Sequence, residues 1–225
     1  MGAGMSPDLF LTLGLGLRWV GIILSPLLLL PLAILVWPEP AERFGKWLSA
    51  QIDAVSGWAL GGAIASALIL VFAQLLVVLL RYAFGMSFTW LNEIVIYAFA
   101  AMFMLGAASA LRDDAHVRVD ILRPRFGVRG RNWIELAGTY LFLFPICIRL
   151  LTMSEQGLAR SWTLFEGSRE SDGLPLLFLF KTLLPAFAVL MIVQGLSEAL
   201  KAALRLTGKM EYAPEEAPHG GIHGA

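Results

Sequence analysis

The sequence predicts an all-α integral membrane protein with four core transmembrane helices, an extra N-terminal transmembrane helix and an interfacial amphipathic helix. Three observations lead to this fold class. Hydrophobic residues make up 58% of the 225 residues and charged residues only 15%, whereas soluble domains carry about 25% charged residues. Several uncharged runs approach or exceed the roughly 20 apolar residues that cross a bilayer core. These runs do not alternate apolar and polar residues, as barrel strands would.

Four apolar runs define the core helices, within a predicted core of residues 54–205. The first is residues 55–80 and the second is residues 94–111, and neither contains a charged residue. The third, residues 136–148, continues past Arg149 to residue 151. The fourth, residues 174–200, is interrupted by Lys181 and Glu198. Because lipid offers no hydrogen-bond partner to backbone groups, each run must be helical to cross the membrane.

The segments that flank the core have their own patterns. Residues 1–38 form an N-terminal extension whose uncharged run, residues 19–37, predicts the extra transmembrane helix despite Pro26 and Pro31. Residues 39–53 place Phe44, Trp47 and Ile52 on one helical face, which is typical of a helix in the membrane interface; a plain linker is the alternative. Residues 206–225 are rich in Pro, Gly and Glu, and we expect a disordered cytoplasmic tail.

Basic residues predict the orientation of the chain in its membrane. The loop after the second core helix contains six arginines, Arg112, Arg118, Arg123, Arg125, Arg129 and Arg131. Cytoplasmic loops are enriched in Lys and Arg, so this loop is placed in the cytoplasm. Counting five spans from that loop puts the C-terminus in the cytoplasm and the N-terminus on the outer side of the membrane. Arg81 falls on the outer side as a mild exception.

The sequence carries no recognisable catalytic, cofactor or metal motif. None of the three histidines lies in a predicted span, which disfavours a membrane haem. Asp113, Asp114, His116 and Asp120 could be drawn as a metal-ligand set, but the six arginines nearby would pair with those carboxylates. Nucleophile-elbow and phosphate-loop motifs are absent, and the zero net charge argues against nucleic-acid binding. We therefore expect no enzyme activity, no cofactor and no metal.

Ionisable residues at membrane depth are costly and need an explanation. Arg81, Glu93, Arg149 and Lys181 all fall toward the outer leaflet in the predicted topology. They either bind a transported ion or substrate, or they pair with each other or a partner protein and fix the packing. Because the middle of each span is apolar except for Gln74, we favour the packing role. An ion pair between Arg81 and Glu93 across the short hairpin is expected.

The cytoplasmic end offers a predicted partner contact. Arg112, His116 and Asp120 are spaced by four and share one face if the helix continues. Arg112 is the best candidate for contacting a carboxylate of a partner or anionic membrane lipids, because its guanidinium can bind in a bidentate way. Small residues at a spacing of four, among them Gly106, allow close helix packing within the chain or with a partner.

These residues together resemble a known family. The stretch RYAFGMSFTWLNE, residues 81–93, ends one helix with Arg81 and opens the next with Trp90 and Glu93. A Gly-Ala-Ala segment starting at Gly106 follows, and then comes Arg112 with the pattern His-Val-x-Val-Asp. This combination, over about residues 55–205, resembles the small membrane subunit, DctQ-like, of tripartite ATP-independent periplasmic (TRAP) transporters.

The resemblance implies a four-helix small permease subunit with both termini in the cytoplasm. Such a subunit scaffolds a large membrane subunit, which carries out ion-gradient-driven symport of an organic acid delivered by a periplasmic substrate-binding protein. The sequence departs from the family pattern through its N-terminal apolar run. Two other functions stay open: the membrane anchor of a quinone-linked oxidoreductase, which the lack of histidines in the spans disfavours, and a stand-alone channel.

Overall fold

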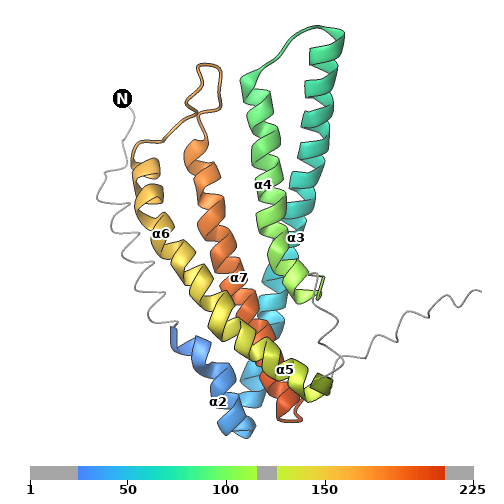
Figure 1. The fold of residues 1–225 in the computed structure, drawn as a ribbon, viewed down its shortest axis with the longest axis vertical. Coiled ribbons are helices and arrows are strands. Elements are labelled where there is room, and N and C mark those ends of the chain that lie inside the picture. Colours follow the sequence, from blue (N-terminus) through green and yellow to red (C-terminus); the bar gives the residue numbers. More distant parts are fainter. Residues whose placement is uncertain (1–24, 116–125, 211–225) are drawn as a thin grey trace, which may run out of the picture.

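The computed structural model describes residues 25–115 and 126–210 (Figure 1). All regular elements in these residues are helical, as the sequence predicts. They are η1 (Ser25–Leu29), α2 (Leu30–Val36), α3 (Pro38–Ala83), α4 (Thr89–Arg112), α5 (Gly127–Gly138), the π-helical η3 (Thr139–Leu143), α6 (Phe144–Thr163) and α7 (Leu177–Leu206). Four helices are long and apolar enough to cross a membrane, Ala41–Phe84, Thr89–Arg112, Arg129–Thr163 and Leu177–Leu206. The four predicted core helices are thereby confirmed.

The N-terminal run is described only in its last part. Ser25–Val36 forms a short apolar helix, below the length of a full span. A complete N-terminal transmembrane helix therefore stays a prediction, and so does the disordered tail, since most of it lies outside the described residues.

Helix α3 joins two segments that the sequence analysis treated separately. The predicted interfacial segment is helical and continues without a break into the first core span. Proline at the start of α3 suits the first helical turn, whose N–H groups need no partner within the helix, and no proline follows Pro40 until the helix ends. Its 46 residues give a length of about 69 Å at about 1.5 Å per residue. That is more than twice the roughly 30 Å hydrocarbon core, so α3 extends well beyond it or tilts strongly.

Helices α5 and α6 form one long helix with a π-helical turn between them. The turn, η3, ends directly before Phe144, and Pro145 follows in the first turn of α6. Proline has no N–H to donate and crowds the preceding turn, and a wider π-helical turn is a common way to insert such an irregularity. The helix thus passes its proline without ending.

The core helices form an open row in place of a closed bundle. Helix α7 is central and packs against α2, α3, α4, α5 and α6, while α3 packs mainly against α4 (Figure 1). The main packing partners of α6 are α7 and η3. Along the outer half the order is therefore α6, α7, α4, α3. We call the end with the α3–α4 and α6–α7 loops the outer end, and the end where α4 and α7 terminate the inner end.

The largest apolar core lies at the inner end. Ile34 of α2, Leu200 and Leu204 of α7 are fully buried and pack together with Phe144 and Leu196. Helix α2 runs along the inner half of α7 and turns at Trp37 into α3. The inner half of α7 is buried on most of its surface, whereas α3 and α6 expose many large apolar side chains, as helices in lipid do.

Candidate functional site

Polar side chains gather at the inner end between α3, α4 and α7. We call Asp53, Ser56, Gln194, Ser197, Glu198 and Lys201 the inner polar cluster. The four residues from α7 are spaced by three, one and three, which puts them on one face of that helix. Asp53 and Ser56 lie one turn apart on the facing side of α3. Two polar faces therefore meet within a largely apolar protein.

Gln194 is the centre of the inner polar cluster, and its side chain is fully buried. Its amide nitrogen Nε2 donates to Asp53 Oδ1 at 3.1 Å and to Glu198 Oε1 at 3.0 Å. Its oxygen accepts a hydrogen bond from Ser56 Oγ at 2.6 Å. Both donors and the acceptor of the amide are therefore used, which is the condition for burying such a group without a large penalty.

Lys201 fills the position between two carboxylates. Its Nζ lies 2.8 Å from Asp53 Oδ2 and 2.8 Å from Glu198 Oε1. Ser197 Oγ also donates to Asp53 Oδ1 at 2.8 Å. The ammonium group occupies the place that a bound cation would need, and the remaining donors are satisfied within the chain. This arrangement suits helix packing better than ion binding.

Arg112 joins α4 to the same region. Its Nη1 donates to the backbone oxygen of Asp53 at 3.1 Å, and its Nε and Nη2 donate to the two carboxyl oxygens of Asp113 at 2.7 and 3.0 Å. These hydrogen bonds hold the pKa of Asp113 below its usual value of 3.8. The guanidinium is thus engaged within the chain, and its predicted partner contact stays a prediction. His116 and Asp120 lie outside the described residues.

Gly106 holds α4 close to α3. A Cβ added at Gly106 would lie 3.6 Å from the Cβ of Ala63, which is ordinary contact for two small residues. Beside it, Ser109 Oγ of α4 donates to the backbone oxygen of Ser56 at 2.7 Å. The close approach of small residues predicted for this helix is therefore seen between α4 and α3.

A second polar group lies at the outer end. We call Glu93, Glu166, Ser168 and Lys181 the outer loop cluster. Glu93 accepts hydrogen bonds from Ser168 Oγ and from the backbone N–H of Leu174, the latter at 2.6 Å. Lys181 pairs with Glu166, which also accepts from Ser161 Oγ at 2.8 Å. The hydrogen bond from Lys181 is the main cause that lowers the pKa of Glu166 below 4.5.

The expected Arg81–Glu93 ion pair was wrong. Among the described residues, the partners of Glu93 lie in the α6–α7 loop, and Arg81 is exposed at the end of α3. The physical reason is the free backbone N–H of Leu174, which needs an acceptor where the loop returns to α4. The packing role expected for Glu93 and Lys181 fits these contacts, but no result tests it directly.

The other predicted positions lie apart from these clusters. Trp90 is 36% exposed and lies beside Phe88, with their ring centroids 6.1 Å apart. Arg149 is exposed on α6. Cys147 is buried against Ala188 and Met191, as a packing residue.

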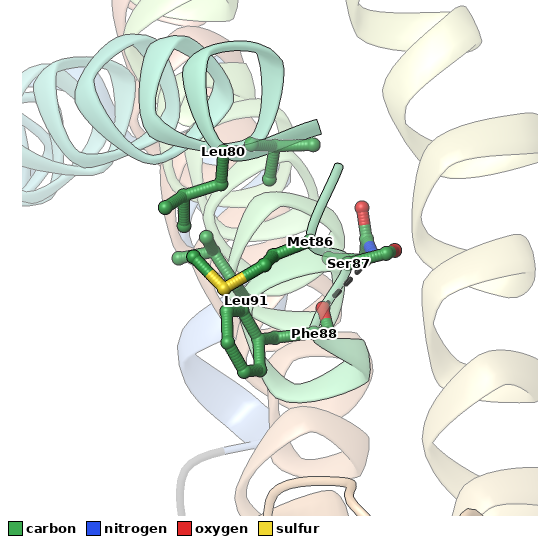
Figure 2. Close-up of a pocket in the computed structure, with 7 residues that line it drawn as sticks. Leu80, Met86, Ser87, Phe88 and Leu91 are labelled. Atoms are coloured by element: carbon green, nitrogen blue, oxygen red, sulfur yellow. Dashed lines mark hydrogen bonds between the residues drawn. The ribbon is translucent and has the colours of Figure 1, made fainter. Parts of the chain in front are cut away.

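A pocket at the outer end is smaller than most ligand sites. Figure 2 shows a pocket at the outer end, between the last turn of α3 and the start of α4. It is lined by Val77, Leu80, Met86, Ser87, Phe88, Leu91 and Asn92 and measures about 170 Å³, whereas small-molecule sites usually span about 300–1,000 Å³. Within the same residues, no group of three or more His, Cys, Asp or Glu could hold a metal ion.

A comparison with protein families decides the identity. Residues 67–205 match the family described as tripartite ATP-independent periplasmic transporters, DctQ component. The chain belongs to this family. No curated protein and no solved structure gave a significant match. The matched range of this DctQ component covers the outer part of α3 and all later helices, whereas α2 and the inner part of α3 precede it.

Sequence reasoning missed the inner polar cluster of this DctQ component. The available signal was the spacing of Gln194, Ser197, Glu198 and Lys201 on one face of the last span. Glu198 was read only as an interruption of an apolar run, and Asp53 was read as part of the interfacial segment. Their meeting depends on the packing of α3 against α7, which spacing within one helix does not specify.

Proposed function

We propose that this DctQ component is the small permease subunit of a TRAP transporter and acts as a scaffold for the large membrane subunit. In this role it supports ion-gradient-driven symport of an organic acid delivered by a periplasmic substrate-binding protein. The family assignment supports membership of a tripartite transporter. In this proposal the other two components bind the substrate and the coupling ion, and this chain has no enzyme activity.

The scaffold role rests on one observation: the polar side chains of both clusters bond to other helices and loops of the same chain. The inner polar cluster joins α3 to α7, and Arg112 connects α4 to α3. The outer loop cluster joins α4 to the α6–α7 loop. Between these ends, Tyr97 of α4 stacks on Phe180 of α7 with ring centroids 4.6 Å apart. Helices fixed at both ends suit a static support better than a moving substrate carrier.

Identification of the native partners tests this function. The tagged protein is purified from bacterial membranes in mild detergent, and the proteins retained with it are identified by mass spectrometry. We expect a large polytopic membrane subunit of the transporter in stoichiometric amount. Retention of a quinone-linked oxidoreductase with a haem absorption band would contradict the proposal and support the membrane-anchor function.

We also propose a periplasmic N-terminus and a cytoplasmic C-terminus in the bacterial inner membrane. In support, α2 leads to the inner end, where Glu42 of α3 lies 3.7 Å from Lys209 after α7. The test uses Ala3→Cys and Glu215→Cys in a Cys147→Ser background, with a membrane-impermeant thiol reagent. Labelling from opposite sides is expected, and labelling of both positions from one side would mean that the N-terminal run does not span.

A further inference from the structure

We infer that the exposed face of α6 binds the large membrane subunit through a polar contact, an inference that rests on the proposed function. Four exposed polar residues of α6, Arg149, Thr152, Gln156 and Arg160, are spaced by three, four and four, and Glu155 is exposed beside them. This spacing places them along one side of the helix over about 16 Å. We call them the α6 polar stripe.

The α6 polar stripe lies opposite the side of α6 that packs inside the protein. Phe144, Cys147 and Ser161 are the buried residues of α6, and Cys147 packs with Ala188 and Met191 of α7. Rotation by about 100° per residue puts Arg149 and Gln156 roughly half a turn away from Cys147 and Ser161. In Figure 1, α6 forms the outside of the helix row, so this face has no neighbour in the described part of the chain.

Contacts with α7 give the depth of the α6 polar stripe. Cys147 lies against Ala188 and Met191, and Trp162 Nε1 donates to Thr182 Oγ1 at 3.0 Å. Helix α7 has no ionisable residue between Lys181 and Glu198. The α6 residues between Cys147 and Gln156, Arg149 among them, therefore lie beside the apolar length of α7, whereas Arg160 lies in the last turn of α6, near the outer end.

The charged residues of α6 differ from the ionisable residues at the two ends of the helix row. Asp53, Glu198 and Lys201 pair with one another, and Lys181 pairs with Glu166. By contrast, no side-chain partner of Arg149, Glu155 or Arg160 of α6 occurs in residues 25–115 and 126–210. Charged residues inside membranes almost always pair or face protein or water, because an isolated charge in hydrocarbon is strongly unfavourable. The α6 polar stripe is therefore unsuited to face lipid.

Helix α3 provides the contrast within the same molecule. Its outer half exposes apolar side chains on most of its surface, Ile64, Leu68, Ile69, Val71, Phe72, Leu75, Leu76, Val78 and Leu79. Residues 55–80 of α3 contain no charged residue, and Gln74 is the exposed side-chain amide in this range. This surface suits lipid, whereas α6 carries Arg149 and Gln156 beside exposed apolar side chains such as Met153, and its polar side suits a protein neighbour.

A second copy of this chain is a poor occupant of the α6 face. Two copies in one membrane, related by a two-fold axis along the membrane normal, place identical residues at the same depth. Arg149 would then lie near Arg149 of the other copy, and like charges at low dielectric repel strongly. The geometry points instead to a different chain, with a carboxylate at the depth of Arg149 and amide or hydroxyl groups along the same helix face. We assign that chain to the large membrane subunit.

Site-specific photo-crosslinking tests the position of this contact. A photoreactive amino acid replaces Gln156 on α6, or Phe72 on α3 as the matched lipid-facing control, in cells that also produce the large subunit. Crosslinking to the large subunit is expected from position 156 and not from position 72. Three results would overturn the inference: a dimer of this chain, an internal crosslink without change in mass, or a crosslink to the large subunit from position 72 only.

Substitution of Arg149 tests the chemistry independently. We compare Arg149→Ala and Arg149→Lys with Arg81→Ala, which removes an exposed arginine at the outer end of α3. Removing one member of a buried charge pair should lower retention of the large subunit about tenfold or more, with partial rescue by lysine and no effect at Arg81. Equal retention by all variants would overturn the polar contact. Failure of the unmodified chain to retain any large subunit would instead contradict the proposed function itself.

Discussion

At the scale of single residues, Glu93 connects the N-terminal part of α4 to the α6–α7 loop. Its carboxylate accepts from Leu174 N and Ser168 Oγ. Glu93→Gln keeps the shape but replaces one acceptor oxygen with an NH₂ group that faces a donor. Because hydrogen bonds to a charged group contribute about 1.5–3 kcal/mol, we expect a lower thermal unfolding temperature in detergent. Glu170→Gln in the same loop is the control, since Glu170 is exposed; an equal loss in both variants would contradict this role.

Glu166 predicts a dependence on acid pH. The hydrogen bond from Lys181 lowers its pKa below 4.5 in the folded protein. A group whose pKa is lowered by folding stabilises the protein above its unfolded pKa, and this contribution disappears as the pH falls through the folded pKa. We therefore expect the unfolding temperature to fall between about pH 5 and about pH 3 by more in the unmodified protein than in Glu166→Gln. Identical pH profiles would show that this ion pair has no measurable effect.

At the scale of elements, the inner polar cluster fixes α3 against α7. Asp53→Ala removes an acceptor of Gln194, Ser197 and Lys201 at once. We expect a loss of about 1–3 kcal/mol, because Gln194 and Ser197 lose an acceptor, while Lys201 keeps Glu198 as its partner. The control is Lys46→Met, which breaks a partly exposed i,i+4 pair with Glu42 and should cost only about 0–1 kcal/mol. Denaturation followed by tryptophan fluorescence compares them, and equal stabilities would contradict the role of the cluster.

The contact between α7 and the π-helical turn depends on Gly195. A Cβ added there would overlap Leu143 and lie 3.3 Å from Phe144 Cε1. Gly195→Ala should therefore push η3 away from α7 and destabilise the protein by about 1–3 kcal/mol. Gly61→Ala is the control, because a Cβ at Gly61 meets nothing within 4 Å. If both variants unfold at the same temperature, the close approach at Gly195 is unimportant.

The elements also show which features sequence reasoning can predict. The four core helices follow from uncharged runs, because lipid leaves the backbone no alternative to a helix. The union of the interfacial segment with the first span was missed, since a polar-to-apolar change at Asp53 marks a change of environment and does not end a helix. The partner of Glu93 was also missed. Arg81 is close to Glu93 in sequence. The backbone N–H of Leu174 is 81 residues away, and its contact with Glu93 depends on how the α3–α4 hairpin packs against the α6–α7 hairpin.

At the scale of the whole molecule, the open row of helices explains how a small chain can support a larger one. A closed bundle would satisfy its own side chains on every helix. Here α7 is surrounded, whereas α3 and α6 each keep a long exposed side. The inner polar cluster and the outer loop cluster form their hydrogen bonds within the chain. The α6 polar stripe, by contrast, is available to contact a neighbouring protein. This combination favours a subunit over an independent carrier.

Transport by purified components tests the scaffold function most directly. Proteoliposomes containing this chain alone, the large subunit alone or both are given a sodium gradient, the binding protein and labelled organic acids, including dicarboxylates and sialic acid. We predict uptake only when both membrane subunits are present, because the polar groups of the inner polar cluster and the outer loop cluster pair within this chain. Uptake by this chain alone would contradict the account.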